Sequence, residues 1–182
     1  MANSYDALMR TSAMHAGDRF GELSKRSAII NGAAIIIGLV HHTDHVLRVD
    51  HSGWPFRPDV NPFTFSLLAY PILLFALLGP ARLFWLRWLF FLIGTGFTLW
   101  AHTMVETPSM QYAMWADNHS LEPQQPDTHN LLGLRSPVMG MVVVAVAMIL
   151  NLVLVAGVLS MLRDGLRRAR KSRASNTTVQ NY

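Results

Sequence analysis

Histidine and carboxylate side chains recur at helical spacing in two stretches of this sequence. The first stretch contains His41, Asp44 and His45, and the second contains His102 and Glu106. Residues four apart share one face of an α-helix, so each stretch would present a pair of side chains on one side. Neutral imidazoles and carboxylates are ligands for transition metals such as zinc, copper and iron. We therefore predict a metal ion bound by His41, His45, His102 and Glu106.

Further polar residues lie close to these pairs in the sequence. His42, Asp44 and His51 are second candidates for the metal shell. If the centre is catalytic, the metal would activate a water molecule, and Glu106 or Asp44 is the candidate general base. The predicted function is that of a small membrane metalloenzyme or a metal-handling protein, and the sequence identifies no substrate or reaction.

Two alternative functions use the same histidines without a metal ion held by the four side chains. In the first, haem b lies between His42, or one of its histidine neighbours, and His102, as in a membrane subunit of a redox complex. In the second, no cofactor is bound, and the histidines form a proton-titratable vestibule in a small transporter or accessory subunit. A Soret band would identify haem, and elemental analysis would identify a metal ion.

Four apolar blocks must position these residues. They cover residues 27–48, 62–80, 83–104 and 137–162. Each is close to the roughly 20 residues that cross a bilayer as a helix. Hydrophobic residues make up 51% of the chain and charged residues only 14%, whereas a soluble domain has about a quarter charged residues. We expect an all-α, integral membrane four-helix bundle, with a long loop between the third and fourth helices.

The remaining segments are polar. Residues 1–26 form an N-terminal arm that could contain an interfacial helix, residues 27–162 form the transmembrane domain, and residues 163–182 form a basic tail that we expect to be disordered. The chain contains no cysteine, which excludes disulfides, thiolate metal ligands and a cysteine nucleophile.

Charge is distributed unevenly about the predicted spans. Twelve of the 15 Lys and Arg residues fall on the side that holds both termini, and seven of the eight histidines fall on or near the other side. The positive-inside rule then places both termini in the cytoplasm and the histidines at the extracytoplasmic end. We expect a multi-pass protein of a bacterial plasma membrane.

The basic run at residues 163–173 follows directly on the last apolar block. Its expected partners are anionic lipid headgroups. Nucleic acid is not expected, because no aromatic residues or known binding module accompany the basic run. A homo-oligomer or a larger membrane complex is the expected protein partner.

Overall fold

The computed structural model describes residues 23–48, 62–123 and 126–179. All its regular elements are helices within these ranges, which confirms the all-α expectation there. The elements are α2 (Lys25–Arg48), α3 (Pro62–Ser66), α4 (Ala69–Leu78), η2 (Ala81–Leu83), α5 (Phe84–Trp100), η3 (Ala101–Val105), α6 (Pro108–Ala116) and α7 (Pro137–Val179). The candidate ligand His51 and most of the N-terminal arm lie outside the described residues.

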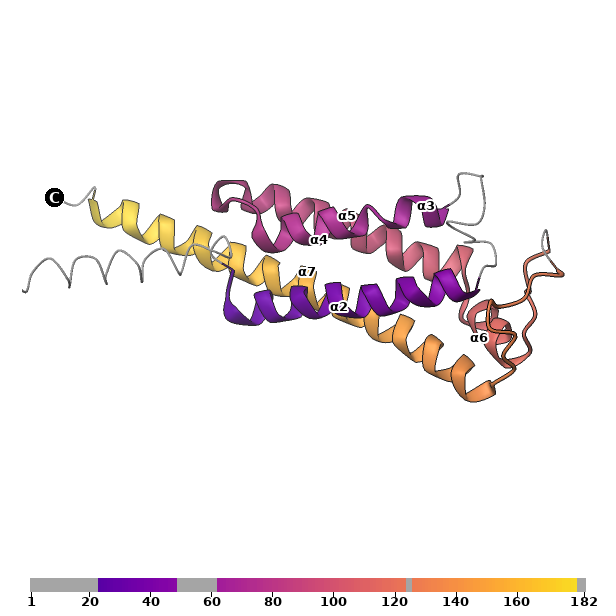
Figure 1. Ribbon diagram of the computed structural model, residues 1–182. Coiled ribbons are helices and arrows are strands. Elements are labelled where there is room, and N and C mark those ends of the chain that lie inside the picture. The colour runs from indigo at the N-terminus through magenta and orange to yellow at the C-terminus, as the bar shows by residue number, and fades with distance from the viewer. Residues whose placement is uncertain (1–22, 49–61, 124–125, 180–182) are drawn as a thin grey trace, which may run out of the picture.

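Helices α2, α4, α5 and α7 lie side by side along one long axis (Figure 1). Helix α7 packs against α2, α5 and α6, and α4 packs against α2 and α5. The C-terminal end of α2, the C-terminal end of α5 and the short helix α6 all lie at the same end of the molecule (Figure 1). The start of α2 and the end of α7 lie toward the opposite end. The two histidine-bearing helix ends are therefore neighbours.

Around a buried apolar core, many large apolar side chains are exposed and several polar side chains are buried. Large apolar residues are exposed along α2, α5 and α7, for example Ile36 at 65% and Leu152 at 68%. Polar residues such as Asn31, Thr95 and Asn151 are buried between the helices. Such contiguous exposed apolar surface is rare in soluble monomers. Two segments among the described residues, Ala81–Val105 and Pro137–Lys171, are long and apolar enough to span a membrane.

The second apolar block is not one continuous helix. It divides into α3 and the ten-residue α4, with a turn at Leu67 and Leu68 between them. Pro71 lies in the first turn of α4. Proline lacks an N–H and its ring clashes with the carbonyl of the fourth residue before it, but it is tolerated in a first turn. The helix therefore restarts two residues before the proline.

Helix α7 is longer than the sequence predicts. It continues to Val179 instead of ending at residue 162, so residues 163–179, expected to be disordered, are helical. Residues 166–174 are mostly Arg, Lys, Leu and Ala, which have high helix propensity, and residues 163–179 contain no proline. A single glycine, Gly165, does not end the helix at the edge of the apolar block.

An ordered cap covers the histidine-bearing end. Thr107 caps α6, and Pro108 occupies its first turn, where proline is favoured. In the loop that follows, the Asn130 side chain donates to the Met114 and Leu134 carbonyls at 2.9 Å each. The Leu131 amide donates to the Leu47 carbonyl at 2.8 Å. The loop is therefore tied to both α6 and the end of α2.

Candidate metal centre

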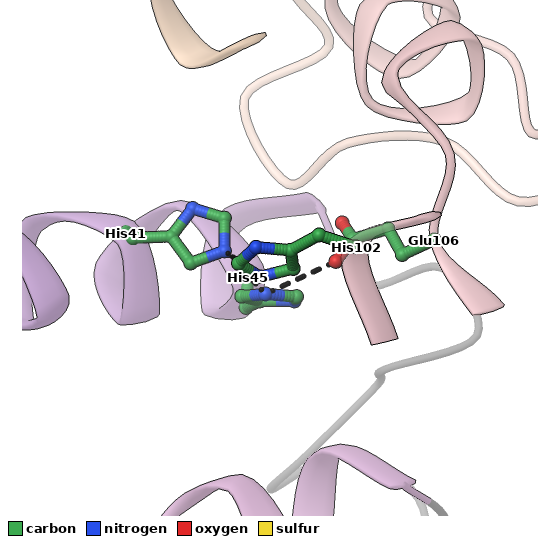
Figure 2. A group of neighbouring side chains, drawn as sticks. All are labelled: His41, His45, His102 and Glu106. Carbon is green, nitrogen blue, oxygen red and sulfur yellow. Dashed lines mark hydrogen bonds and ion pairs between the residues drawn. The ribbon is translucent and has the colours of Figure 1, made fainter. Parts of the chain in front are cut away.

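Four buried side chains from two helices converge at the capped end. His41 and His45 come from α2, His102 comes from η3, and Glu106 follows η3 directly (Figure 2). The His41 Nε2 lies 2.9 Å from the His102 Nε2 and 3.0 Å from the His45 Nε2. The His45 Nε2 lies 3.2 Å from a Glu106 carboxylate oxygen. These are the four residues that the sequence selects as metal ligands.

The spacing of these atoms is compatible with one metal ion. One ligand atom from each of the four residues can be chosen so that all lie within 4.8 Å of one another. Bonds of about 2.0–2.2 Å to one ion separate neighbouring ligand atoms by roughly 3 Å and opposite ones by at most about 4.4 Å. The contacts of 2.9 to 3.2 Å match the first value. The most distant pair would need to close by a few tenths of an ångström.

Asn151 fixes the orientation of the His102 ring. The His102 Nδ1 donates to the Asn151 Oδ1, which lies 2.9 Å away on α7. Because Nδ1 carries the proton, the His102 Nε2 presents a lone pair to the His41 Nε2. Metal-binding histidines usually donate their second ring nitrogen to such an acceptor. The His102 ring therefore has the tautomer and the orientation that a metal ligand needs.

The short contact between the His41 and His102 Nε2 atoms also limits where protons can lie. Two imidazole lone pairs facing each other at 2.9 Å repel, so a proton or a cation must lie between the two Nε2 atoms. The His41 Nδ1 is buried and has no hydrogen-bond partner among the described residues. Without a cation, the His41 Nε2 therefore carries the proton and donates to the His102 Nε2, and a metal ion would take the place of this proton.

Arg48 places the His45 proton on Nε2, whereas the His102 proton is on Nδ1. The Arg48 Nη2 lies 3.3 Å from the His45 Nδ1, and a guanidinium can only donate. The His45 Nδ1 therefore accepts, and its proton lies on Nε2, which faces Glu106 and His41. Metal binding at this Nε2 would require the proton to be on Nδ1 instead. The contact with Arg48 would then be lost, at a cost of about 1.5–3 kcal/mol.

The guanidinium of Arg48 is held by two carboxylates. Its Nε donates to the Asp44 Oδ2 at 2.8 Å, and its Nη1 forms an ion pair with the Glu106 Oε1. The other Asp44 oxygen accepts from the Trp115 indole N–H at 2.7 Å. Both Asp44 oxygens therefore have partners outside the histidine group. Asp44 acts here as a partner of Arg48, and Glu106 is the better placed of the two candidate bases.

A π-helical turn brings His102 and Glu106 to the centre. Residues Ala101–Val105 form this turn, closed by a 2.8 Å hydrogen bond from the Glu106 amide to the Ala101 carbonyl. Such turns are rare and occur frequently at functional sites. The Gln111 side chain donates to the Glu106 carbonyl at 3.3 Å, which links this turn to α6.

His42 does not join the converging group. Its Nε2 lies 3.2 Å from the Ser66 hydroxyl, and its ring packs against Phe63 and Tyr70. The His41 and His102 Nε2 atoms are 2.9 Å apart, which is too close for this pair to bind opposite faces of one haem, since such ligands lie roughly 4 Å apart with the macrocycle between them. Haem between His42 and His102 stays a prediction.

Sequence reasoning did not assign Asn151 and Trp115 to the site. Asn151 is a strongly polar residue in the middle of the long apolar helix α7, and a buried amide at that depth needs a partner. The presence of this amide in an apolar helix could have predicted a hydrogen bond to a histidine on another helix. No comparable pattern indicates Trp115. Comparison of this chain with family models, curated proteins and solved structures finds no match.

Proposed function

We propose that this protein is a multi-pass membrane protein that binds one transition-metal ion through His41, His45, His102 and Glu106. The convergence of three imidazole Nε2 atoms and one carboxylate in a buried site carries this proposal. Three imidazoles and a carboxylate suit zinc or iron better than copper(I), which prefers sulfur ligands. The proposed location is the extracytoplasmic end of a bacterial plasma-membrane protein with both termini in the cytoplasm.

Burial supports the membrane part of the proposal. Two segments are long and apolar enough to span a bilayer, and the exposed apolar surface continues along α2. Buried ionised groups are costly in a membrane unless they are paired. Arg48 is fully buried and pairs with Asp44 and Glu106. We propose that all four apolar blocks lie in the bilayer, and that α4, with ten residues, is the shortest of the membrane helices.

The surroundings of the centre favour a reactive metal over a structural one. His41, His45, His102 and Glu106 all line one cavity between the helices. Structural zinc sites are closed by four protein ligands, whereas catalytic sites keep a coordination position open to substrate or water. With four protein ligands here, the open position would be a fifth one, and the cavity beside the ligands provides the space for it. We propose a metal-dependent enzyme, in which the metal would supply Lewis-acid chemistry and Glu106 would bind the ion while its Oε1 pairs with Arg48. The metal-handling alternative predicts exchange of the ion without turnover.

Elemental analysis of the detergent-purified chain tests the metal centre. We expect about one zinc or iron per chain, and loss of at least nine-tenths of it in the double variant His41→Ala, His45→Ala, because two of four ligands are removed. His129→Ala is the matched control, since His129 is exposed and its Nδ1 contacts the Asn118 carbonyl. Metal retained by the double variant, or absent from the wild-type chain, would refute the site and leave the cofactor-free vestibule as the better function.

Topology can be tested separately, because the chain has no cysteine of its own. We expect Thr128→Cys to react with a membrane-impermeant maleimide in intact cells, and Lys171→Cys to react only after lysis. The reverse pattern would overturn the proposed orientation without affecting the metal assay. The expected lipid partners, anionic headgroups at the basic run, and a homo-oligomer or larger complex remain part of this proposal.

A further inference from the structure

An apolar cavity of about 330 Å³ adjoins the proposed metal centre. One part of its wall is formed by His41, His45, His102 and Glu106. The rest is almost entirely apolar and comes from α2, α4, α5 and α7, with residues such as Leu73, Phe91, Leu150 and Leu154. A cavity of this size is at the lower end of the range for small-molecule sites. Its occupant would be mostly apolar, with one polar end at the metal.

The cavity is partly open, and its opening is apolar. Several large side chains both line the cavity and expose 41 to 58% of their surface on the outside of the helices: Phe65, Leu68, Phe90, Ile93 and Phe97. An entrance edged by such residues excludes water-soluble polar substrates. It admits a molecule that is already dissolved among the acyl chains of the bilayer.

Tyr70 provides an unused polar group in the cavity wall. Its hydroxyl is buried and has no hydrogen-bond partner among the described residues. Its ring lies 5.2 Å from the ring of His42, whose own ring is 6.1 Å from that of His45. A buried hydroxyl without a partner costs about 1–3 kcal/mol. A ligand oxygen bound near the histidines would give Tyr70 an acceptor.

The net charge of the metal-loaded centre indicates which polar group the ligand carries. Glu106 and Asp44 contribute two negative charges and Arg48 one positive charge, while imidazoles that bind a metal are neutral. A divalent ion therefore changes the net charge of this group from −1 to +1. In an apolar setting such an excess is stabilised by an anion. An anionic oxygen ligand at the open metal position would neutralise the site.

We propose that the cavity binds a single-chain carboxylate amphiphile, such as a fatty acid, taken from the bilayer. Its carboxylate occupies the open position of the metal and accepts from Tyr70, and its chain lies between α2, α4 and α5. This inference rests on the proposed function, because it requires the metal ion for the positive charge. It names the class of ligand and specifies no reaction.

Cobalt(II) in place of the native metal gives a direct readout, since its visible bands change when the ligands of the ion change. We expect dodecanoate to shift the bands of the Co²⁺-loaded chain with one-to-one stoichiometry. Methyl dodecanoate has the same chain without the charge, and we expect it to bind roughly 10- to 100-fold more weakly. The metal-free chain should bind dodecanoate no more tightly than the loaded chain binds the ester.

Two glycines of α2 supply a matched pair of variants. Gly38 lines the cavity, and an added Cβ would meet no atom within 4 Å. Gly32 also has open space around it but is not part of the cavity wall. We expect Gly38→Leu to weaken dodecanoate binding at least about tenfold by filling the cavity, with cobalt content unchanged. Gly32→Leu should match the wild type in both measurements.

The outcomes distinguish the two proposals. The fatty-acid inference would be overturned if the cobalt-loaded chain does not bind dodecanoate, if it binds the ester equally well, or if Gly38→Leu has no effect on binding. None of these results would contradict the metal centre. A chain that takes up no cobalt, zinc or iron would overturn both. A band shift that requires the carboxylate and is lost only in the Gly38 variant would support the inference.

Discussion

Asn151 offers the sharpest test of how the centre is held. Its Oδ1 accepts from the His102 Nδ1 at 2.9 Å, and this bond fixes both the tautomer and the orientation of the ring. Replacing it in Asn151→Leu leaves the four proposed ligands untouched. Loss of such a partner typically weakens metal binding 10- to 100-fold, which corresponds to about 1.4–2.7 kcal/mol.

Folding and metal affinity are measured separately in this variant. Asn151→Leu leaves the buried His102 Nδ1 without its acceptor, which costs about 1–3 kcal/mol in the free energy of unfolding, and the apolar contacts of leucine offset part of this cost. We therefore expect a moderate loss of thermal stability without metal, together with the roughly 10- to 100-fold rise in the zinc dissociation constant. The stoichiometry of one zinc per chain should remain, because no ligand has been removed.

Competition between the detergent-purified protein and a chromophoric zinc chelator measures the dissociation constant directly. Asn31→Ala is the control, since Asn31 is another buried asparagine, ten residues before His41 on α2. We expect the control to remain within about twofold of the wild type. Zinc affinity unchanged in Asn151→Leu would refute the assignment of His102 as an oriented ligand.

Three further predictions concern the centre and the packing around it. Zinc affinity should fall as the pH is lowered from 7 to 4, because protons compete with the metal for the imidazole nitrogens. Equilibrium dialysis at each pH checks this, and a flat profile would contradict histidine ligation. Trp115→Phe removes the 2.7 Å donor to Asp44, and we expect it to lower the free energy of unfolding by about 1.5–3 kcal/mol, measured by thermal melting with Tyr112→Phe as a control. Gly157→Ala should destabilise the bundle by about 1–3 kcal/mol, because its Cβ would lie 2.8 Å from atoms of Asn31 and Phe91. The same substitution at Gly96, which has open space around it, should leave the melting temperature unchanged or slightly higher.

The two ends of the molecule are fastened by different chemistry. At the end opposite the histidines, Asp164 of α7 accepts from the Ser27 hydroxyl at 2.6 Å and from the Ser24 amide at 2.9 Å. This carboxylate lies at the N-terminus of α2, where unpaired amides favour a negative charge. Helices α2 and α7 are therefore joined there without any metal. The histidine end can lose its proposed ion without the two helices separating.

The sequence by itself determined the helical class and the identity of the converging residues. Apolar blocks of about 20 residues predict helices, and spacing of four places His41 with His45 and His102 with Glu106 on shared faces. Polar side chains on an apolar helix avoid lipid, so the two polar faces were expected to meet. These arguments need only local periodicity and the cost of exposing polar groups, which is why they succeed without coordinates.

The tertiary structure decided how each side chain is used. In the structure, Asp44 accepts hydrogen bonds from Arg48 and Trp115, and His42 contacts Ser66. His102 donates to Asn151, which is 49 residues away in the sequence and lies on another helix. The tertiary structure also divides the second apolar block and extends α7 to Val179. Partners so distant in the chain leave no periodic signal, because their contact depends on how the helices pack and not on spacing within either helix.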